Sequence, residues 1–109
     1  MRILLLHLDP ARLDELAASL GDDGHAVTPI SDEQPLTESF DVFVVCAEAS
    51  PQIALDLAAK IGADARLAAA SILFAGGTQA ALTEAQRRFP RASFTRIDAL
   101  VTALASMES

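Results

Sequence analysis

The sequence is poor in several features, and each shortage excludes a class of protein. Cys46 is the single cysteine among 109 residues, so no internal disulfide and no zinc site built on several thiolates can form. The apolar runs have the length of strands, well short of the ~20 residues that a membrane-spanning helix needs. The first apolar run reaches Asp9 and Pro10 before any site typical of signal-peptide cleavage. We therefore expect a cytoplasmic protein that does not enter a membrane.

Positive charge is also scarce, and it is unevenly placed. Residues 1–64 carry three cations against twelve acids, whereas residues 65–109 carry five arginines against three acids. The acidic excess argues against nucleic-acid binding, which depends on Lys and Arg that neutralise phosphates. The motifs GxGxxG and GxxxxGK[ST] of dinucleotide and nucleoside-triphosphate sites are absent. We expect no nucleic-acid partner and no cofactor.

The apolar pattern predicts one α/β domain over residues 1–109, which is long enough to bury a core. The continuous apolar run at 42–46 indicates a strand that is covered on both faces. Four further strands are predicted at 2–8, 24–30, 71–75 and 92–95, and they alternate with helical periodicity at 10–20, 51–61, 78–88 and 98–107. Such alternation favours a parallel sheet with helices on both faces.

Capping residues mark the ends of these helices. Asp9 has the position of an N-cap before Pro10, and Gly21 and Gly62 have the positions where helices stop. Thr78 is expected to cap the helix that ends near 88, with Thr83 as the alternative cap of a shorter helix.

Two connections are less regular. Segment 31–39 is polar and broken by Pro35, so at best one helical turn is expected after that proline. Segment 63–70 is alanine-rich and is interpreted as a helix extension or a loop. The strand predicted at 24–30 contains Pro29, whose nitrogen cannot donate a hydrogen bond to a neighbouring strand. We therefore expect this strand near an edge of the sheet.

The opening stretch RILLLHLDPARLDELAASLGDDGHAV resembles the start of a response-regulator receiver domain. Gly24, His25 and Val27 match the Gly-His-x-Val second strand of that family, and the spacing from Cys46 through Pro51 matches the family's path into its third helix. The resemblance implies a three-layer, flavodoxin-like or CheY-like (βα)5 fold. Its five-stranded parallel sheet would have the order 2-1-3-4-5, with the second helix short or absent.

The positions that carry chemistry in receivers differ here. The family phosphorylates an aspartate at the end of its third strand, with Mg²⁺ held by an acidic pair at the end of the first. The matching residues of this chain are His7, Leu8, Cys46, Ala75 and Arg96. A leucine cannot serve an ion that requires oxygen ligands. The resemblance thus implies a degenerate receiver, or pseudo-receiver, which is neither an enzyme nor phosphorylated by the usual route.

Four arginines within ten residues offer a partner-binding surface, and no acid interrupts them: Arg87, Arg88, Arg91 and Arg96. In receivers the usual interaction face consists of the fourth helix, fifth strand and fifth helix, which implies a protein partner or self-association there. An anionic ligand such as a nucleotide messenger is an intermediate possibility. A solvated helix end whose cations complement the macrodipole is the simpler explanation for Arg87 and Arg88.

The strand ends also suggest an alternative function. Cys46 and His7 would end adjacent strands, where a thiol beside an imidazole could begin a nucleophile and base pair. Gly76, Gly77 and Thr78 precede a helix and could hold an anion on free backbone N–H groups. Against both, a lone cysteine and a histidine at strand ends are commonly packing residues, and glycines are common in strand-to-helix turns.

Overall fold

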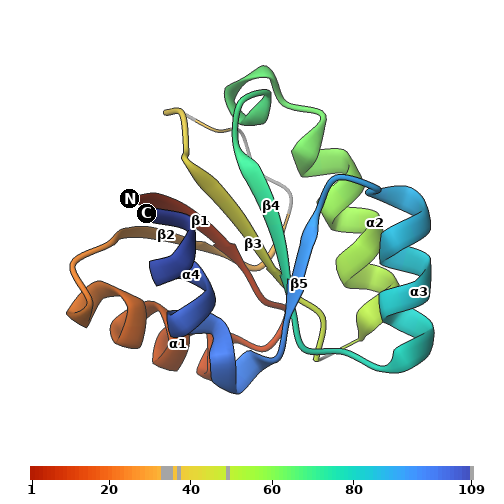
Figure 1. Ribbon diagram of the computed structural model, residues 1–109, viewed down its shortest axis with the longest axis horizontal. Coiled ribbons are helices and arrows are strands. Elements are labelled where there is room, and N and C mark those ends of the chain that lie inside the picture. The colour runs from red at the N-terminus through yellow and green to blue at the C-terminus, as the bar shows by residue number, and fades with distance from the viewer. Residues whose placement is uncertain (33–35, 37, 49, 109) are drawn as a thin grey trace.

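The computed structural model describes residues 1–32, 36, 38–48 and 50–108. Strands and helices alternate along it, except that no helix is described between the second and third strands (Figure 1). The strands are β1 (Arg2–Leu6), β2 (Ala26–Ile30), β3 (Val42–Cys46), β4 (Ser71–Ala75) and β5 (Ser93–Thr95). The helices are α1 (Pro10–Asp22), α2 (Pro51–Gly62), α3 (Gln79–Arg88) and α4 (Leu100–Glu108), with short 3-10 turns η1 (Ala65–Leu67) and η2 (Ile97–Ala99).

The five strands form one parallel sheet in the order β2-β1-β3-β4-β5, which confirms the predicted order and direction. Every residue of β3 is buried, as its unbroken apolar run predicts. β2 lies at an edge, where Pro29 costs no ladder hydrogen bond on its outer side.

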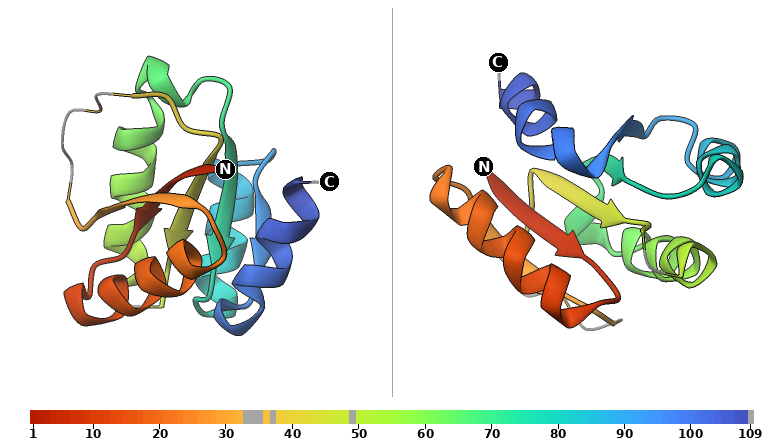
Figure 2. Two further views of the ribbon diagram at one scale, coloured as in Figure 1. Left: turned by 90° about the vertical axis from the view of Figure 1, so that its left-hand side faces the viewer. Right: turned by 90° about the horizontal axis from the view of Figure 1, so that it is seen from below.

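Helices cover both faces of the sheet, so the fold has three layers (Figure 2). Side chains alternate along each strand, and in β1 they divide between two cores. Leu4 and Leu6 join a core with Leu55 of α2 and Ala85 of α3. Ile3, Leu5 and Cys46 are among the residues that join the other core, which α1 and α4 close. One pair of helices therefore closes each core: α2 and α3 on one face of the sheet, α1 and α4 on the other.

Two predicted helix ends are wrong. Gly21 lies inside α1, and the turn after that helix uses Gly24, whose φ is +91°. Gly62 is the last residue of α2, with Ala63 as its C-cap. Glycine is only weakly unfavourable inside a helix, so neither residue forces a stop. The cap of α3 is Thr78, as predicted, whereas Thr83 donates its hydroxyl to the carbonyl of Gln79 within the helix.

Other boundaries shift by a few residues. β1 ends at Leu6 instead of residue 8, because the chain turns so that the N–H of Asp9 can donate to His7. The 3-10 turns η1 and η2 occupy parts of the segments predicted as a loop and as a helix start. Residues 31–32, 36 and 38–41 contain no helix, and the turn expected after Pro35 lies outside the described residues.

Among the residues that the structure describes, no helix combines the length and the apolar character needed to span a bilayer.

Candidate functional site

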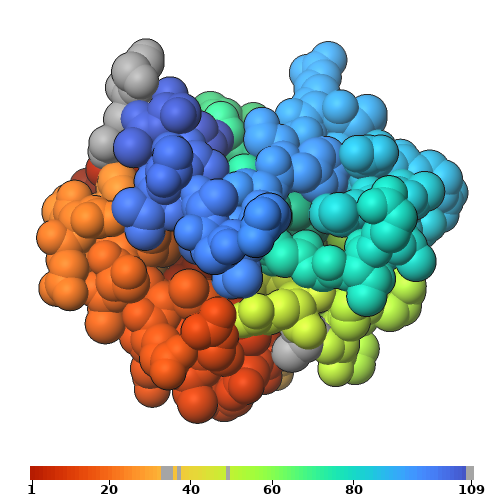
Figure 3. Space-filling view, turned by 60° about the horizontal axis from the view of Figure 1, so that its bottom comes forward, coloured from red at the N-terminus to blue at the C-terminus, as the bar shows by residue number. Residues whose placement is uncertain are grey.

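The residues matched to receiver chemistry meet at the carboxyl edge of the sheet, which Figure 3 brings forward. His7 and Leu8 follow β1, Cys46 and Ala75 end β3 and β4, and Arg96 follows β5. The parallel register places Cys46 opposite Ala75. The start of α1 and the connections that follow β3, β4 and β5 surround this edge. In open parallel sheets ligands bind at this edge, so its chemistry decides what the domain can do.

His7 is fully buried, and both of its ring nitrogens have partners. The backbone N–H of Asp9 donates to Nδ1 over 2.9 Å, so Nδ1 carries no proton. Nε2 then carries the proton and donates it to Oε1 of Glu48 over 2.7 Å. Both ring nitrogens of the neutral imidazole therefore have a hydrogen-bond partner, and the side chain links the end of β1 to the loop after β3.

Glu48 accepts a second hydrogen bond, from Nε of Arg12 over 2.9 Å, while another nitrogen of Arg12 donates to Glu15 over 2.8 Å. Partial burial works to raise the pKa of Glu48, but the hydrogen bonds from Arg12 and His7 outweigh it and hold that pKa below its usual range. The contact with Glu48 in turn raises the pKa of Arg12. A guanidinium cation thus supplies positive charge at the edge where receivers hold Mg²⁺.

Arg12 and Glu48 were not predicted as site residues from the sequence. A signal was present, because Glu48 lies two residues past β3 and His7 one residue past the neighbouring β1. Neighbouring parallel strands bring such positions together. The position of Arg12, in the first turn of α1, follows from the cap at Asp9, which accepts from the N–H of Ala11 over 3.1 Å.

Cys46 is fully buried in the core between the sheet, α1 and α4. Burial raises the pKa of its thiol to about 12, and the negative charge of Glu48 adds to the effect. The thiolate is therefore a minor species at neutral pH. The suggested pair of Cys46 with His7 does not form, because the hydrogen bonds of His7 go to Glu48 and Asp9.

The donor set does not fit Mg²⁺. Leu8 is half-buried and packs against the core beneath α2, Ala75 is buried, and the Asp9 carboxylate caps α1. The Glu48 carboxylate is already held by Arg12 and His7. Within the described part of the chain, no group of three or more His, Cys, Asp or Glu side chains is placed to hold a metal ion. A hard cation needs several oxygen ligands, which these residues do not offer.

The glycine turn has a packing role. The N–H of Gly76 donates to the carbonyl of Thr95 over 3.1 Å, and Thr78 accepts from the N–H of Ala81 over 3.1 Å. Gly77 has a φ of +104°, and a Cβ built there would lie 3.2 Å from the Cβ of Ala47. Close packing of two loops thus explains why glycine occupies this position.

The four neighbouring arginines diverge in space. Arg87 pairs with Glu84 on its own helix, and Arg96 pairs with Asp98 over 2.8 Å after β5. Arg88 extends to Asp56 of α2 over 3.0 Å, away from the expected interaction face, which in this structure consists of α3, β5 and α4. Arg91 has no ion pair among the described residues and lines a groove near the start of β5. The four arginines are close in sequence, but their side chains do not form one cationic cluster.

The comparisons with known proteins identify the fold. No family model and no curated protein matches the chain. A response regulator from Burkholderia pseudomallei, solved with a phosphorylated aspartate, aligns with a TM-score of 0.73 and 18% identity over 96% of this chain. This chain spans 64% of that structure's chain. The inactive regulatory domain of the repressor of iron transport regulator aligns with a TM-score of 0.69 and 21% identity, over 97% of this chain and 93% of that one.

The fold is the CheY-like fold of receiver domains. This confirms the architecture predicted from the sequence. At these identities the likeness establishes the fold alone, and function rests on the residues at the carboxyl edge.

The contacts of Glu48 predict a pH-dependent loss of stability in Glu48→Gln. Because its folded-state pKa is lowered, the ionised carboxylate stabilises the fold above the unfolded-state pKa of about 4.3, and this contribution is lost as the pH falls through the folded-state pKa. We expect the variant to lose roughly 1 kcal/mol in urea unfolding at neutral pH, since glutamine keeps the acceptor for His7 but loses the charge. The difference should shrink in acid.

Glu84→Gln is the matched control for this prediction. It removes a carboxylate that pairs with Arg87 on an exposed helix surface, where ion pairs contribute little. Equal stability of wild type and Glu48→Gln at every pH would show that the contact between Arg12 and Glu48 contributes nothing.

Proposed function

We propose that this domain is a pseudo-receiver: a regulatory module of the two-component type that acts by binding a protein partner, without phosphorylation and without enzymatic activity. The single observation that carries the proposal is the buried Cys46 thiol at the phosphoacceptor position. A neutral thiol whose pKa is raised to about 12 does not replace a carboxylate as acceptor of a phosphoryl group.

The contacts of Arg12 support the same proposal. In phosphoryl transfer a metal ion neutralises charge that develops on the phosphoryl oxygens. Here a guanidinium already neutralises Glu48, and neither His7 nor Leu8 offers an oxygen ligand. The Glu48 carboxylate therefore has protein partners without an ion or a phosphoryl group. We place such a module in the cytoplasm, where a single free thiol stays reduced.

Phosphorylation independence is tested by incubating the protein with acetyl phosphate and Mg²⁺ and measuring its intact mass. We expect no added phosphoryl mass, and no amide shifts near Cys46 or Asp9 when beryllofluoride is titrated in NMR experiments. A receiver with the full acidic set is the positive control. A stoichiometric mass gain that disappears in Asp9→Asn would contradict the proposal, because it would make Asp9 the acceptor.

For the interaction face we propose the surface of α3, β5 and α4, and we commit to a second copy of the chain as the partner. β5 is a short, half-buried edge strand, so this side of the sheet is not closed by another strand. The side chains of Arg87 and Arg96 on this side are 72% and 83% exposed. Val101 of α4 is one of two large apolar side chains left exposed in the described structure, the other being Ile53 of α2.

Sedimentation velocity over a range of protein concentrations tests this face. We expect concentration-dependent dimers that Val101→Glu abolishes and that Ile53→Glu leaves intact, because only Val101 lies on the proposed face. Both substitutions place a charge at an exposed position on a helix, so they are matched in their cost to folding. Disruption by Ile53→Glu alone, or a monomer at every concentration, would overturn the assignment.

A further inference from the structure

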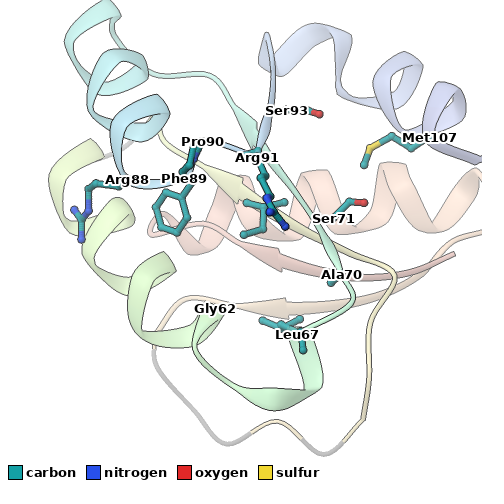
Figure 4. A pocket seen from close by; sticks show the side chains of 13 residues that line it. Gly62, Leu67, Ala70, Ser71, Arg88, Phe89, Pro90, Arg91, Ser93 and Met107 are labelled. Carbon is teal, nitrogen blue, oxygen red and sulfur yellow. The ribbon is translucent and has the colours of Figure 1, made fainter.

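The amino end of the sheet, opposite the candidate site, contains a groove of about 540 Å³. It lies between the chain that leaves α3, the start of β5, the start of β4 and the turn η1 (Figure 4). Its apolar lining includes Leu67, Ile72, Phe89, Ala92 and Met107. The volume falls in the range of small-molecule sites, which are mostly apolar with a few polar groups.

The groove is formed by firmly placed side chains. Phe89 packs against Phe74 of β4, with ring centroids 5.2 Å apart, and Leu67 is buried. Ile72, Phe89 and Ala92 pack against the core beneath α2 and α3 while remaining partly exposed. Binding an apolar group here would cover surface that the fold leaves in contact with water.

The charge of the groove is opposite to that of the protein. The chain has a net charge of −7, yet the described residues that line this groove include two arginines and no acid. Arg88 is turned away toward Asp56, whereas the side chain of Arg91 extends over the groove, whose lining also includes the hydroxyl-bearing Ser71 (Figure 4). An adjoining hollow shares Ser71 and contains Asp41, whose carboxylate accepts from the backbone N–H of Arg2.

We propose that this groove binds a small monocarboxylate with an apolar body, whose carboxylate pairs with Arg91. A guanidinium fork matches a carboxylate in two parallel hydrogen bonds. Arg91 has no ion pair among the described residues, and its one charge balances a single negative charge, which favours a monocarboxylate over a phosphate dianion. The apolar wall then takes the body of the ligand. The groove lies at the other end of the strands from the carboxyl edge, so this inference does not depend on the absence of phosphorylation. It borders the proposed interaction face through Arg88, Ser93 and Met107.

The test is an NMR titration of the full chain with octanoate, 1-octanol, acetate and inorganic phosphate. Octanoate should give saturable amide shifts confined to residues 67–72 and 88–93. Octanol, which lacks the charge, and acetate and phosphate, which lack the apolar body, should bind more weakly. Arg91→Gln should weaken octanoate binding roughly tenfold or more, which corresponds to the loss of one charge-assisted contact. Arg91→Lys, which keeps the charge, should bind with intermediate affinity.

Arg66→Gln is the matched control, because Arg66 is an exposed arginine of η1 beside the groove and does not line it. It should bind octanoate as wild type does. The proposal is overturned if octanol binds as tightly as octanoate, if phosphate alone gives the same shifts, if Arg91→Gln binds unchanged, or if no titration saturates. Arg91 is exposed, so its variants should keep the wild-type spectrum without ligand.

Discussion

The hydrogen bonds that join His7, Glu48 and Arg12 determine the structure and the charge of the carboxyl edge of the sheet. His7 is fully buried, and a buried imidazole without partners would destabilise the fold. Glu48 accepts from it, the N–H of Asp9 donates to it, and Arg12 neutralises the carboxylate that this arrangement keeps ionised. The cap of α1, the end of β1 and the loop after β3 are thereby linked through one network. The same groups occupy the edge where a receiver would hold its metal and its phosphoryl group.

The fold does not need that chemistry. Its two cores are built from strand alternation and from helix faces, and neither core contains a residue matched to the acidic pair except Leu8, at the margin of one. Cys46, at the end of β3, belongs to one of these cores. On the function proposed above, the domain acts through its surfaces, while its carboxyl edge is occupied by the packing of Cys46 and by the contacts of Glu48 with Arg12 and His7.

Much of the architecture could be predicted, since β3 and β4 read as unbroken apolar runs and Thr78 is a recognisable cap. The helix ends at Gly21 and Gly62 were wrong because glycine tolerates a last helical turn. The site was harder, since the partner of His7 is a loop residue whose contact depends on strand register and on a rotamer. The directions of the arginines could not be predicted for a related reason: Arg88 ends α3 and pairs with Asp56, whereas Arg91 lies in the turn that follows and lines the groove.

We propose that the network of Arg12, Glu48 and His7 takes the place of a metal site. A titration with Mn²⁺, which takes the same oxygen ligands as Mg²⁺ and broadens nearby amide signals, tests it most directly. We expect no saturable broadening at residues 7–9 and 46–48. Saturable broadening centred on Asp9 and Glu48 would contradict it, because it would show that these carboxylates leave their protein partners to bind a cation.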